Sequence, residues 1–355
     1  MSVSERPLHL IDLPLKIITG SKAIYSIPGL LRELGYEKPA IFTDSNLYNI
    51  IGRKLEESLI DEKFEIKVHI VKDSRFQDID EARSFISETH SDVILAVGGG
   101  KVIDVSKYSS FLEKKRFISV PTAVSHDGIA SPAVSLKDDE NYPVSRFAKP
   151  PIAVVADLDI ISKAPHRLIA SGFGDIIGKF TSVRDAILAR RIRGEYVGDY
   201  SLSLALMSAK MVSKNASLIA SHNLEGMSIL VEAAISCGVA MGIAGSSRPC
   251  SGSEHLFSHA LDRVYPEKKS LHGEQVGVGT IMMAYLHGLN WRKIRNILEI
   301  VGAPVDHEGL GVPPEAIIEA LISAHKIRRR YTILGFMGLS KEAAINLARK
   351  TLVIP

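Results

Sequence analysis

The segment VILAVGGGKVIDVSK, residues 93–107, predicts how the first half of the chain folds. Its first five residues are all apolar, which is typical of a strand covered on both faces. Gly98, Gly99 and Gly100 follow and lead into a stretch of helical period. Lacking a Cβ, they let a ligand approach the backbone and can take positive φ. The next helix would point its free N–H groups at this turn, so the segment predicts a phosphate cradle.

Two features of this turn keep an ordinary βα turn open as the alternative. Three glycines also occur in turns that bind nothing, so the motif alone is weakly specific. The spacing is not G-x-G-x-x-G, and the turn follows the fourth predicted strand rather than the first, unlike the Rossmann fingerprint.

Further strand-like runs flank this segment on both sides. They are PLKIITG (14–20), PAIFTDS (39–45), FEIKVHIV (64–71), FISVPT (117–122) and IAVVADLDI (152–160). Stretches of helical period at 26–35, 47–60 and 78–90 separate them. This alternation predicts parallel βαβ units, and therefore an α/β domain with a parallel sheet.

The pattern changes at ISKAPHR, residues 161–167, where Pro165 could begin a new helix. Beyond it the chain has long helical periods rich in alanine and leucine. We predict an α/β nucleotide-binding domain at 1–162 and an all-α metal- and substrate-binding domain at 163–355. A cleft between them is a common place for ligands.

Composition excludes several classes of protein. The chain has 355 residues with 43 basic against 40 acidic ones, a balance too even for nucleic-acid binding. Cys237 and Cys250 form no C-x-x-C pair, so we expect structural thiols in a reducing compartment. The N-terminus lacks a secretion-type pattern. The apolar stretch 233–245 is shorter than the ~20 residues of a spanning helix, which predicts a core helix and a cytoplasmic protein.

Polar residues after the strands are candidate ligand contacts. The loop SVPTAVSHDGIASPA (119–133) contains Thr122, Ser125, His126, Asp127 and Ser131. Such residues are common in any loop, but these could line a cofactor or substrate, and Asp127 could hold a substrate hydroxyl.

Asp44, at the end of the run 39–45, could bind an adenosine ribose. A helix N-cap is an equally good interpretation. If Asp44 faces the ribose, its charge disfavours a 2′-phosphate, although Ser45 and Asn46 could tolerate one.

Histidines and a carboxylate in the helical half give the strongest chemical signal. SGSEHLFSHALD (251–262) places His255 and His259 on one helix face, and LHGEQVGVG (271–279) adds His272. SGFGDIIGK (171–179) places Asp175 close to the beginning of a glycine-flanked helix. Two imidazoles and a carboxylate can form a catalytic zinc site. A helix cap for Asp175 and a C-terminal-turn position for His272 are the alternatives, but neither explains the flanking glycines.

Five motifs together resemble the sn-glycerol-1-phosphate dehydrogenases, within the larger group of glycerol dehydrogenases, iron-type alcohol dehydrogenases and dehydroquinate synthases. They are GGGKVIDVSK (98–107), PTAVSHDGIASP (121–132), GFGDIIGK (172–179), AGSSRPCSGSEHLFSHALD (244–262) and HGEQVGVG (272–279). The resemblance runs from about residue 20 to 279, and HKIRRRYTIL (325–334) is a weaker continuation.

The resemblance implies a dehydroquinate synthase-like fold and a role for each matching residue. Asp175, His255 and His272 would bind one zinc ion. Asp127, Asp175 and His259 would contact substrate, with Asp175 and His259 catalytic. The residues that would contact NAD or NADP are Gly98, Gly99, Gly100, Lys101, Val102, Asp104, Thr122, Ser125 and Ser131.

The implied reaction is the reduction of dihydroxyacetone phosphate to sn-glycerol 1-phosphate, the backbone of archaeal membrane phospholipids. The resemblance also implies a homo-oligomer, and the charge balance and the short apolar stretch predict no nucleic-acid partner and no membrane insertion.

Three other functions remain open from the sequence. A glycerol or polyol dehydrogenase would act on a substrate without phosphate, although Lys179, Arg248 and Arg263 near the motifs favour phosphate. A dehydroquinate synthase-like lyase would carry a glutamate where this chain has Asp175. A nucleotide-binding regulator would have a closed structural metal site, with His259 as a fourth ligand.

Overall fold

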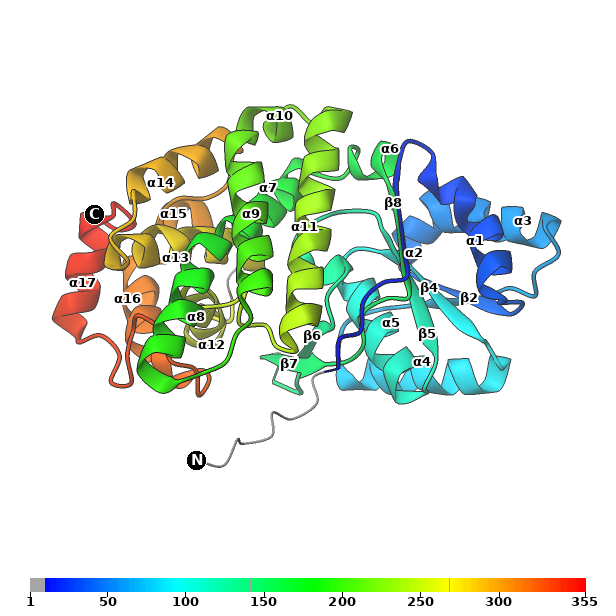
Figure 1. Ribbon diagram of the computed structural model, residues 1–355, viewed down its shortest axis with the longest axis horizontal. Coiled ribbons are helices and arrows are strands. Elements are labelled where there is room, and N and C mark those ends of the chain that lie inside the picture. Colours follow the sequence, from blue (N-terminus) through cyan, green and yellow to red (C-terminus); the bar gives the residue numbers. More distant parts are fainter. Residues whose placement is uncertain (1–9, 141, 268) are drawn as a thin grey trace, which may run out of the picture.

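Six parallel strands form the sheet around which the first half of the chain is built (Figure 1). The structure, a computed structural model, describes residues 10–140, 142–267 and 269–355. The spatial order of the strands is β1-β8-β5-β4-β2-β3. Their bounds are β1 Lys16–Gly20, β2 Pro39–Thr43, β3 Lys67–Ile70, β4 Val93–Gly98, β5 Arg116–Pro121 and β8 Ala153–Asp157. Every strand predicted from the sequence is present.

Helices cover both faces of this sheet. They are α1 Ile27–Leu34, the short α2 Ser45–Leu47, α3 Arg53–Asp61, α4 Phe76–Thr89 and α5 Gly100–Leu112, with a single-turn helix η1 Ala23–Ser26 and a π-helical turn η2 Tyr48–Gly52. Apolar side chains of α1 and α3 pack on one face, and those of α4 and α5 on the other. Strands buried on both faces explain why β2, β4 and β8 are apolar at nearly every position.

A small antiparallel hairpin, which the sequence analysis did not predict, follows β5. It comprises β6 Ala133–Lys137 and β7 Pro143–Phe147, after the single-turn helix η3 Asp127–Ile129. Only alternate residues of β6 are buried, so its apolar signal is weak. The hairpin lies beside the N-terminal half of α5, where Asp104 accepts a hydrogen bond from the Ser135 N–H at 3.1 Å.

Helices make up the second half, as predicted. They are α6 Leu158–Ile161, α7 His166–Ile177, α8 Lys179–Arg193, α9 Asp199–Lys214, α10 Ala216–Ala220, α11 Leu224–Ala244, α12 Ser253–Val264, α13 His272–Leu286, α14 Trp291–Ile300, α15 His307–Leu310, α16 Pro314–Ser323, η4 Ala324–Lys326 and α17 Lys341–Lys350. The described residues after 157 contain no strand. Pro165 directly precedes α7, so the predicted helix start is correct, whereas the domain division at 162 and 163 stays a prediction.

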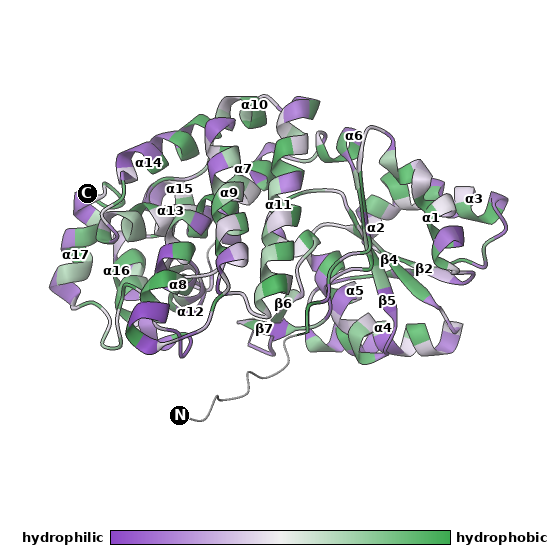
Figure 2. Ribbon diagram, viewed as in Figure 1, coloured by the Kyte–Doolittle hydropathy of each residue, from purple (hydrophilic) through white to green (hydrophobic). Residues whose placement is uncertain are grey.

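Helix α11 corrects the expectation drawn from the apolar stretch 233–245. The helix has 21 residues and, by length and composition, is apolar enough to cross a membrane. Figure 2 shows hydrophobic residues along much of it. In this fold 56% of its most apolar window is buried, and it packs against α9 and α7. The apolar residues of α11 therefore pack against other helices of the second half.

Candidate active site

Three helices bring Asp175, His255 and His272 together. Asp175 lies near the end of α7, not near the beginning of a helix as predicted, and it is not a cap. His255 lies in the first turn of α12. His272 is the first residue of α13, which rules out the C-terminal-turn alternative. The three residues come from separate helices, so their meeting depends on how those helices pack.

One oxygen of Asp175 faces the two imidazoles. Its Oδ1 lies 3.3 Å from His255 Nε2 and 3.9 Å from His272 Nε2. One ligand atom from each of the three residues lies within 4.8 Å of the other two. Asp175 is buried, and its Oδ1 has no hydrogen-bond partner among the described residues. A buried acceptor of this kind requires a positively charged or donor group, and a divalent metal ion fits these donors.

The other oxygen of Asp175 is held by the chain itself. Oδ2 accepts the Asp127 N–H at 3.0 Å and lies 3.2 Å from Lys179 Nζ. Lys179 also pairs with Asp127 Oδ2 at 2.9 Å. Burial alone would raise the pKa of Asp175, but the Lys179 ammonium and His255 hold that pKa well below its usual range. The carboxylate is therefore charged and oriented.

Two hydrogen bonds orient the imidazoles. His255 Nδ1 lies 2.8 Å from Glu254 Oε1, and His272 Nδ1 lies 3.0 Å from the hydroxyl of Ser258, which donates to Gln275 Oε1 at 2.7 Å. These bonds place a proton on each Nδ1 and leave each Nε2 free to bind a metal, a common arrangement around metal sites. Glu254, Ser258 and Gln275 were not predicted as site residues, although each lies within three residues of a predicted ligand.

Glycines beside two of the ligands allow α7 and α13 to touch. A Cβ on Gly273 would lie 1.9 Å from the Ser171 carbonyl oxygen, and one on Gly174 would lie 2.4 Å from the Gly273 carbonyl oxygen. No side chain fits at either position. The glycines that flank Asp175 and His272 in the sequence are therefore explained by helix packing.

His259 lies one turn beyond His255 and outside the group of three ligand atoms. Its Nε2 accepts a hydrogen bond from the Arg328 guanidinium at 3.2 Å, and its Nδ1 lies 3.8 Å from Asp262 Oδ2. Its ring stacks on that of His272, with centroids 5.5 Å apart. Burial and the charge of Arg328 lower the pKa of His259, so the ring is mainly neutral near pH 7.

Two cavities lie on either side of the glycine turn. One of about 370 Å³ is lined by Gly100, Lys101, Asp104, Asp127, Ser131, His255, His259 and His272 among others, but Asp175 is not one of its lining residues. The other, of about 670 Å³, lies at the carboxyl ends of β2 and β8, and Asp44, Gly99 and Thr122 are among its lining residues. Gly98, Val102 and Ser125 line neither cavity.

Two predicted cofactor contacts have structural partners. Asp44 caps α2, because its side chain accepts the N–H groups of Asn46 and Leu47, yet it also lines the larger cavity. Asp104 pairs with the fully buried Lys107 at 3.3 Å. Both interpretations of Asp44 are therefore compatible with its position.

The glycine turn differs from the prediction in its backbone. Gly98, Gly99 and Gly100 all lack positive φ, because the turn is formed by Gly99 in an extended conformation at the N-cap of α5. Gly100 instead provides space, since its Cβ would lie 2.2 Å from His126 Nε2.

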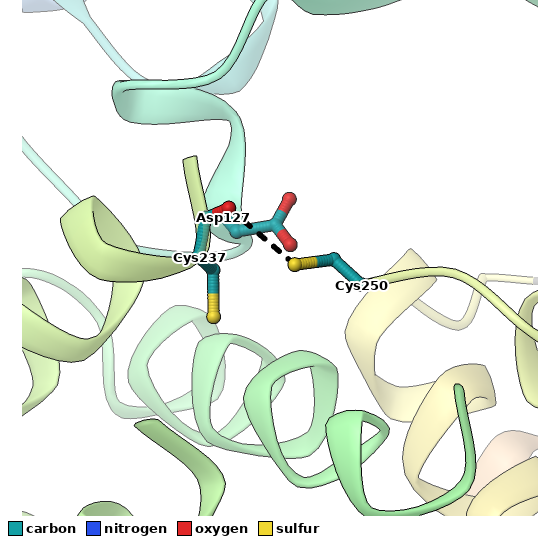
Figure 3. A group of neighbouring side chains, drawn as sticks. All are labelled: Asp127, Cys237 and Cys250. Carbon is teal, nitrogen blue, oxygen red and sulfur yellow. Dashed lines mark hydrogen bonds between the residues drawn. The ribbon is translucent and has the colours of Figure 1, made fainter. Parts of the chain in front are cut away.

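The two cysteines lie against Asp127 (Figure 3). Both are reduced and buried, and Cys250 Sγ donates to the Cys237 carbonyl oxygen at 3.4 Å. Burial raises the pKa of Cys250 well above its usual range, which disfavours the thiolate that a metal needs. The Lys179 ammonium already pairs with Asp127. Cys237 and Cys250 are therefore buried thiols that contribute to packing.

Known proteins resemble this chain over most of its length. A family model described as iron-containing alcohol dehydrogenase matches residues 18–165. Two relatives named glycerol-1-phosphate dehydrogenase (NAD(P)+) are 50% identical in Staphylothermus marinus and 47% identical in Thermofilum pendens. These alignments cover 98% and 97% of this chain, respectively, and 99% of each relative.

Solved structures show the same fold at low identity. Glycerol dehydrogenase from Schizosaccharomyces pombe superposes with a TM-score of 0.82 at 20% identity, covering 98% of this chain and 91% of that one. Sulfoacetaldehyde reductase from Bifidobacterium kashiwanohense, solved with NAD+, superposes with a TM-score of 0.77 at 15% identity, covering 98% and 100%. The predicted fold class and the resemblance drawn from the motifs are thus confirmed. The chain belongs to the family of NAD(P)+-linked glycerol-1-phosphate dehydrogenases, and it is an oxidoreductase.

Proposed function

We propose that this protein reduces dihydroxyacetone phosphate to sn-glycerol 1-phosphate with NADH or NADPH and a zinc ion. The observation that carries the proposal is the Asp175 Oδ1 without a hydrogen-bond partner, which faces two oriented imidazoles that line a cavity next to the glycine turn. The relatives' names supply the product. In the reaction the carbonyl carbon gains a hydride, its oxygen gains a proton, and the nicotinamide is oxidised.

Asp175, His255 and His272 would hold the metal, since two nitrogens and one oxygen suit zinc. When bound, the metal supplies a Lewis acid for the carbonyl and the nicotinamide supplies the hydride. Lys179 keeps Asp175 charged, and Glu254 and Ser258 keep the imidazoles turned toward the ligand position. The protein thus prepares the site before a ligand arrives.

Asp127 and His259 would bind and protonate the substrate. Both line the smaller cavity. The Asp127 carboxylate, held by Lys179, can accept a hydrogen bond from the substrate hydroxyl. Because His259 Nε2 accepts from Arg328, its proton lies on Nδ1, so proton delivery to the alkoxide requires a rotated ring or a linking water.

The nucleotide would lie across the glycine turn. Its adenosine part fits the larger cavity beside Asp44 and Thr122, and its nicotinamide the smaller one beside Lys101 and Ser131. The free N–H groups at the start of α5 would meet the pyrophosphate between them.

A steady-state assay tests the proposal. Zinc-loaded protein is given NADH or NADPH with dihydroxyacetone phosphate or dihydroxyacetone, and the product is analysed on a chiral column. We expect a strong preference for the phosphate ester and the sn-1 product. Equal turnover of both substrates would favour the polyol dehydrogenase instead, and nucleotide binding without turnover would favour the regulator.

We further propose a cytoplasmic homo-oligomer without nucleic acid or membrane insertion. The near-even charge supports the absence of nucleic acid. Tyr200, Met207 and Met211 expose apolar side chains along α9, which suits contact with another subunit. Light scattering of the purified protein tests the assembly, and a monomeric mass would contradict it.

A further inference from the structure

The smaller cavity contains four basic side chains whose role is not yet explained. They are Lys101, Lys137, Arg146 and Arg328. Three have partners or positions that account for them: Lys101 donates to the Lys72 carbonyl at 2.9 Å, Lys137 pairs with Asp73 at 2.8 Å, and Arg146 is exposed and lies over the ring of Phe76. Arg328 is different.

Arg328 bridges the two halves of the protein without a carboxylate. Its guanidinium donates to the Ser145 hydroxyl on β7 and to His259 Nε2 on α12. Among residues 10–140, 142–267 and 269–355, no carboxylate oxygen lies within ion-pair distance of it. Burial lowers its pKa. A half-buried cation with only neutral acceptors lacks a counter-charge, which is energetically unfavourable.

A second guanidinium without a carboxylate partner, that of Arg330, lies near Arg328. Arg330 donates to the Ser251 carbonyl and, at 2.8 Å, to the Ser247 hydroxyl, and both serines line the cavity. Burial, with Arg328 and Arg248 nearby, lowers the pKa of Arg330 to about 9. In the described part of the chain no carboxylate pairs with it either, whereas Arg248 pairs with Glu195. The cavity wall therefore carries the charge of Arg328, and Arg330 lies behind it without an ion-pair partner, its charge offset in part by Glu254 and Glu195 at longer range.

The basic residues that the sequence suggested do not line this cavity. Lys179 is buried between Asp127 and Asp175, Arg248 is paired with Glu195, and Arg263 is exposed on α12. The segment 325–334, with its three consecutive arginines, supplies the cation instead.

We propose that Arg328 binds the phosphate group of the substrate, and that Arg330 strengthens the positive field behind it. This inference rests on the proposed function. A guanidinium presents parallel N–H groups that match two phosphate oxygens. Arg328 contacts His259, whose ring stacks on the metal-ligand candidate His272. The phosphate of one short substrate can thus lie beside Arg328 while its carbonyl lies beside the metal-ligand candidates that line the same cavity.

The test compares two substrates in matched variants of the zinc-loaded enzyme. Arg328→Met removes the charge, Arg328→Lys keeps it, and Arg329→Met removes the exposed neighbouring charge as a control. For Arg328→Met we expect kcat/KM with dihydroxyacetone phosphate to fall about 100-fold, as for a lost charge-assisted hydrogen bond. With dihydroxyacetone kcat/KM should fall much less, by the loss of the His259 contact alone, so the preference for the phosphate ester should largely disappear. Arg329→Met should behave like the unmodified protein, and Arg328→Lys should retain part of the preference.

Different results would contradict the role of Arg328 and the proposed reaction. An equal loss on both substrates would mean that Arg328 only supports His259 or the hairpin, and would overturn the assignment. Unchanged preference in Arg328→Met would also overturn it while leaving the proposed reaction intact. An unmodified enzyme that does not prefer the phosphate ester would remove both.

A binding measurement gives a readout independent of turnover. Calorimetry with sn-glycerol 1-phosphate and with glycerol, in the presence of NAD+, isolates the contribution of the phosphate. That difference should largely disappear in Arg328→Met and persist in Arg329→Met. If Arg328→Met does not fold, Arg328→Lys serves: it should bind the ester at least about tenfold more weakly, because the ammonium lacks the planar fork. Unweakened binding in Arg328→Lys would contradict the assignment.

Discussion

At the scale of single residues, the function proposed here depends on one carboxylate with two different oxygens. Asp175 Oδ2 is fixed by Asp127 and Lys179, while Oδ1 faces the imidazoles. Asp175→Ala should abolish zinc retention and turnover but leave NADH binding intact, because the glycine turn and the larger cavity are separate from it. Elemental analysis and NADH fluorescence measure both. Asp199→Ala, which removes an exposed carboxylate, is the control, and full activity of Asp175→Ala would refute the site.

His259 should behave differently from the three ligand residues. His259→Ala is expected to retain zinc, because the ring lies outside the group of ligand atoms, and to lose turnover by about 10²–10⁴-fold, as for a lost proton donor. Zinc content and single-turnover rates distinguish the two effects. Loss of zinc from this variant would identify His259 as a ligand, as the regulator hypothesis expects.

Lys179 is the residue on which both carboxylates of the site depend. It is fully buried, and its pairs with Asp127 and Asp175 raise its pKa well above the usual range despite the opposing effect of burial. Lys179→Met leaves the carboxylates of Asp127 and Asp175 without the buried cation that pairs with both, so we expect the free energy of unfolding to fall by about 3–5 kcal/mol. Denaturant unfolding of the metal-free protein measures it. If the free energy of unfolding did not fall measurably, water would have replaced the Lys179 ammonium between the two carboxylates.

At the scale of elements, the contact between α7 and α13 decides whether the ligands meet. Gly273→Ala would place a Cβ 1.9 Å from the Ser171 carbonyl oxygen. Because both atoms lie on or next to rigid helical backbone, α13 must shift, and we expect a loss of about 1–3 kcal/mol in unfolding free energy together with weaker zinc binding.

A matched control for this variant lies on α1. Gly29→Ala places its Cβ in open space, and it should raise the unfolding free energy by up to about 1 kcal/mol. Chemical unfolding and zinc titration of both variants provide the comparison. If Gly273→Ala kept its zinc affinity, the close helix contact would not control the site.

At the scale of the whole molecule, the metal should couple helices from across the second half. A ligand that binds only the folded state stabilises it, by about 2.7 kcal/mol at a hundredfold excess over Kd. Chelation should therefore lower the melting temperature of the unmodified protein, and zinc should restore it. Calorimetry of Asp175→Ala should show neither shift. Equal stabilisation of that variant would place the zinc elsewhere.

Features that local sequence patterns encode could be predicted without a structure. The strand, glycine turn and helix at 93–107 follow from a run of apolar residues and from glycines in succession, and the helical second half follows from its period. Each signal arises between neighbours in the chain, so no tertiary information is needed. The motifs also identified the family.

Which side chains meet could be read only from the folded protein. From the sequence, Asp175 was predicted near the beginning of a helix but lies near the end of α7, and it was open whether His272 begins or ends a helix. In a sequence, a glycine that permits close helix contact cannot be distinguished from a glycine that permits a turn. Arg328 could not be chosen among many basic residues, since what distinguishes it is the lack of a carboxylate partner at a cavity wall. Burial and pairing are set by residues distant in the chain, and no local period records them.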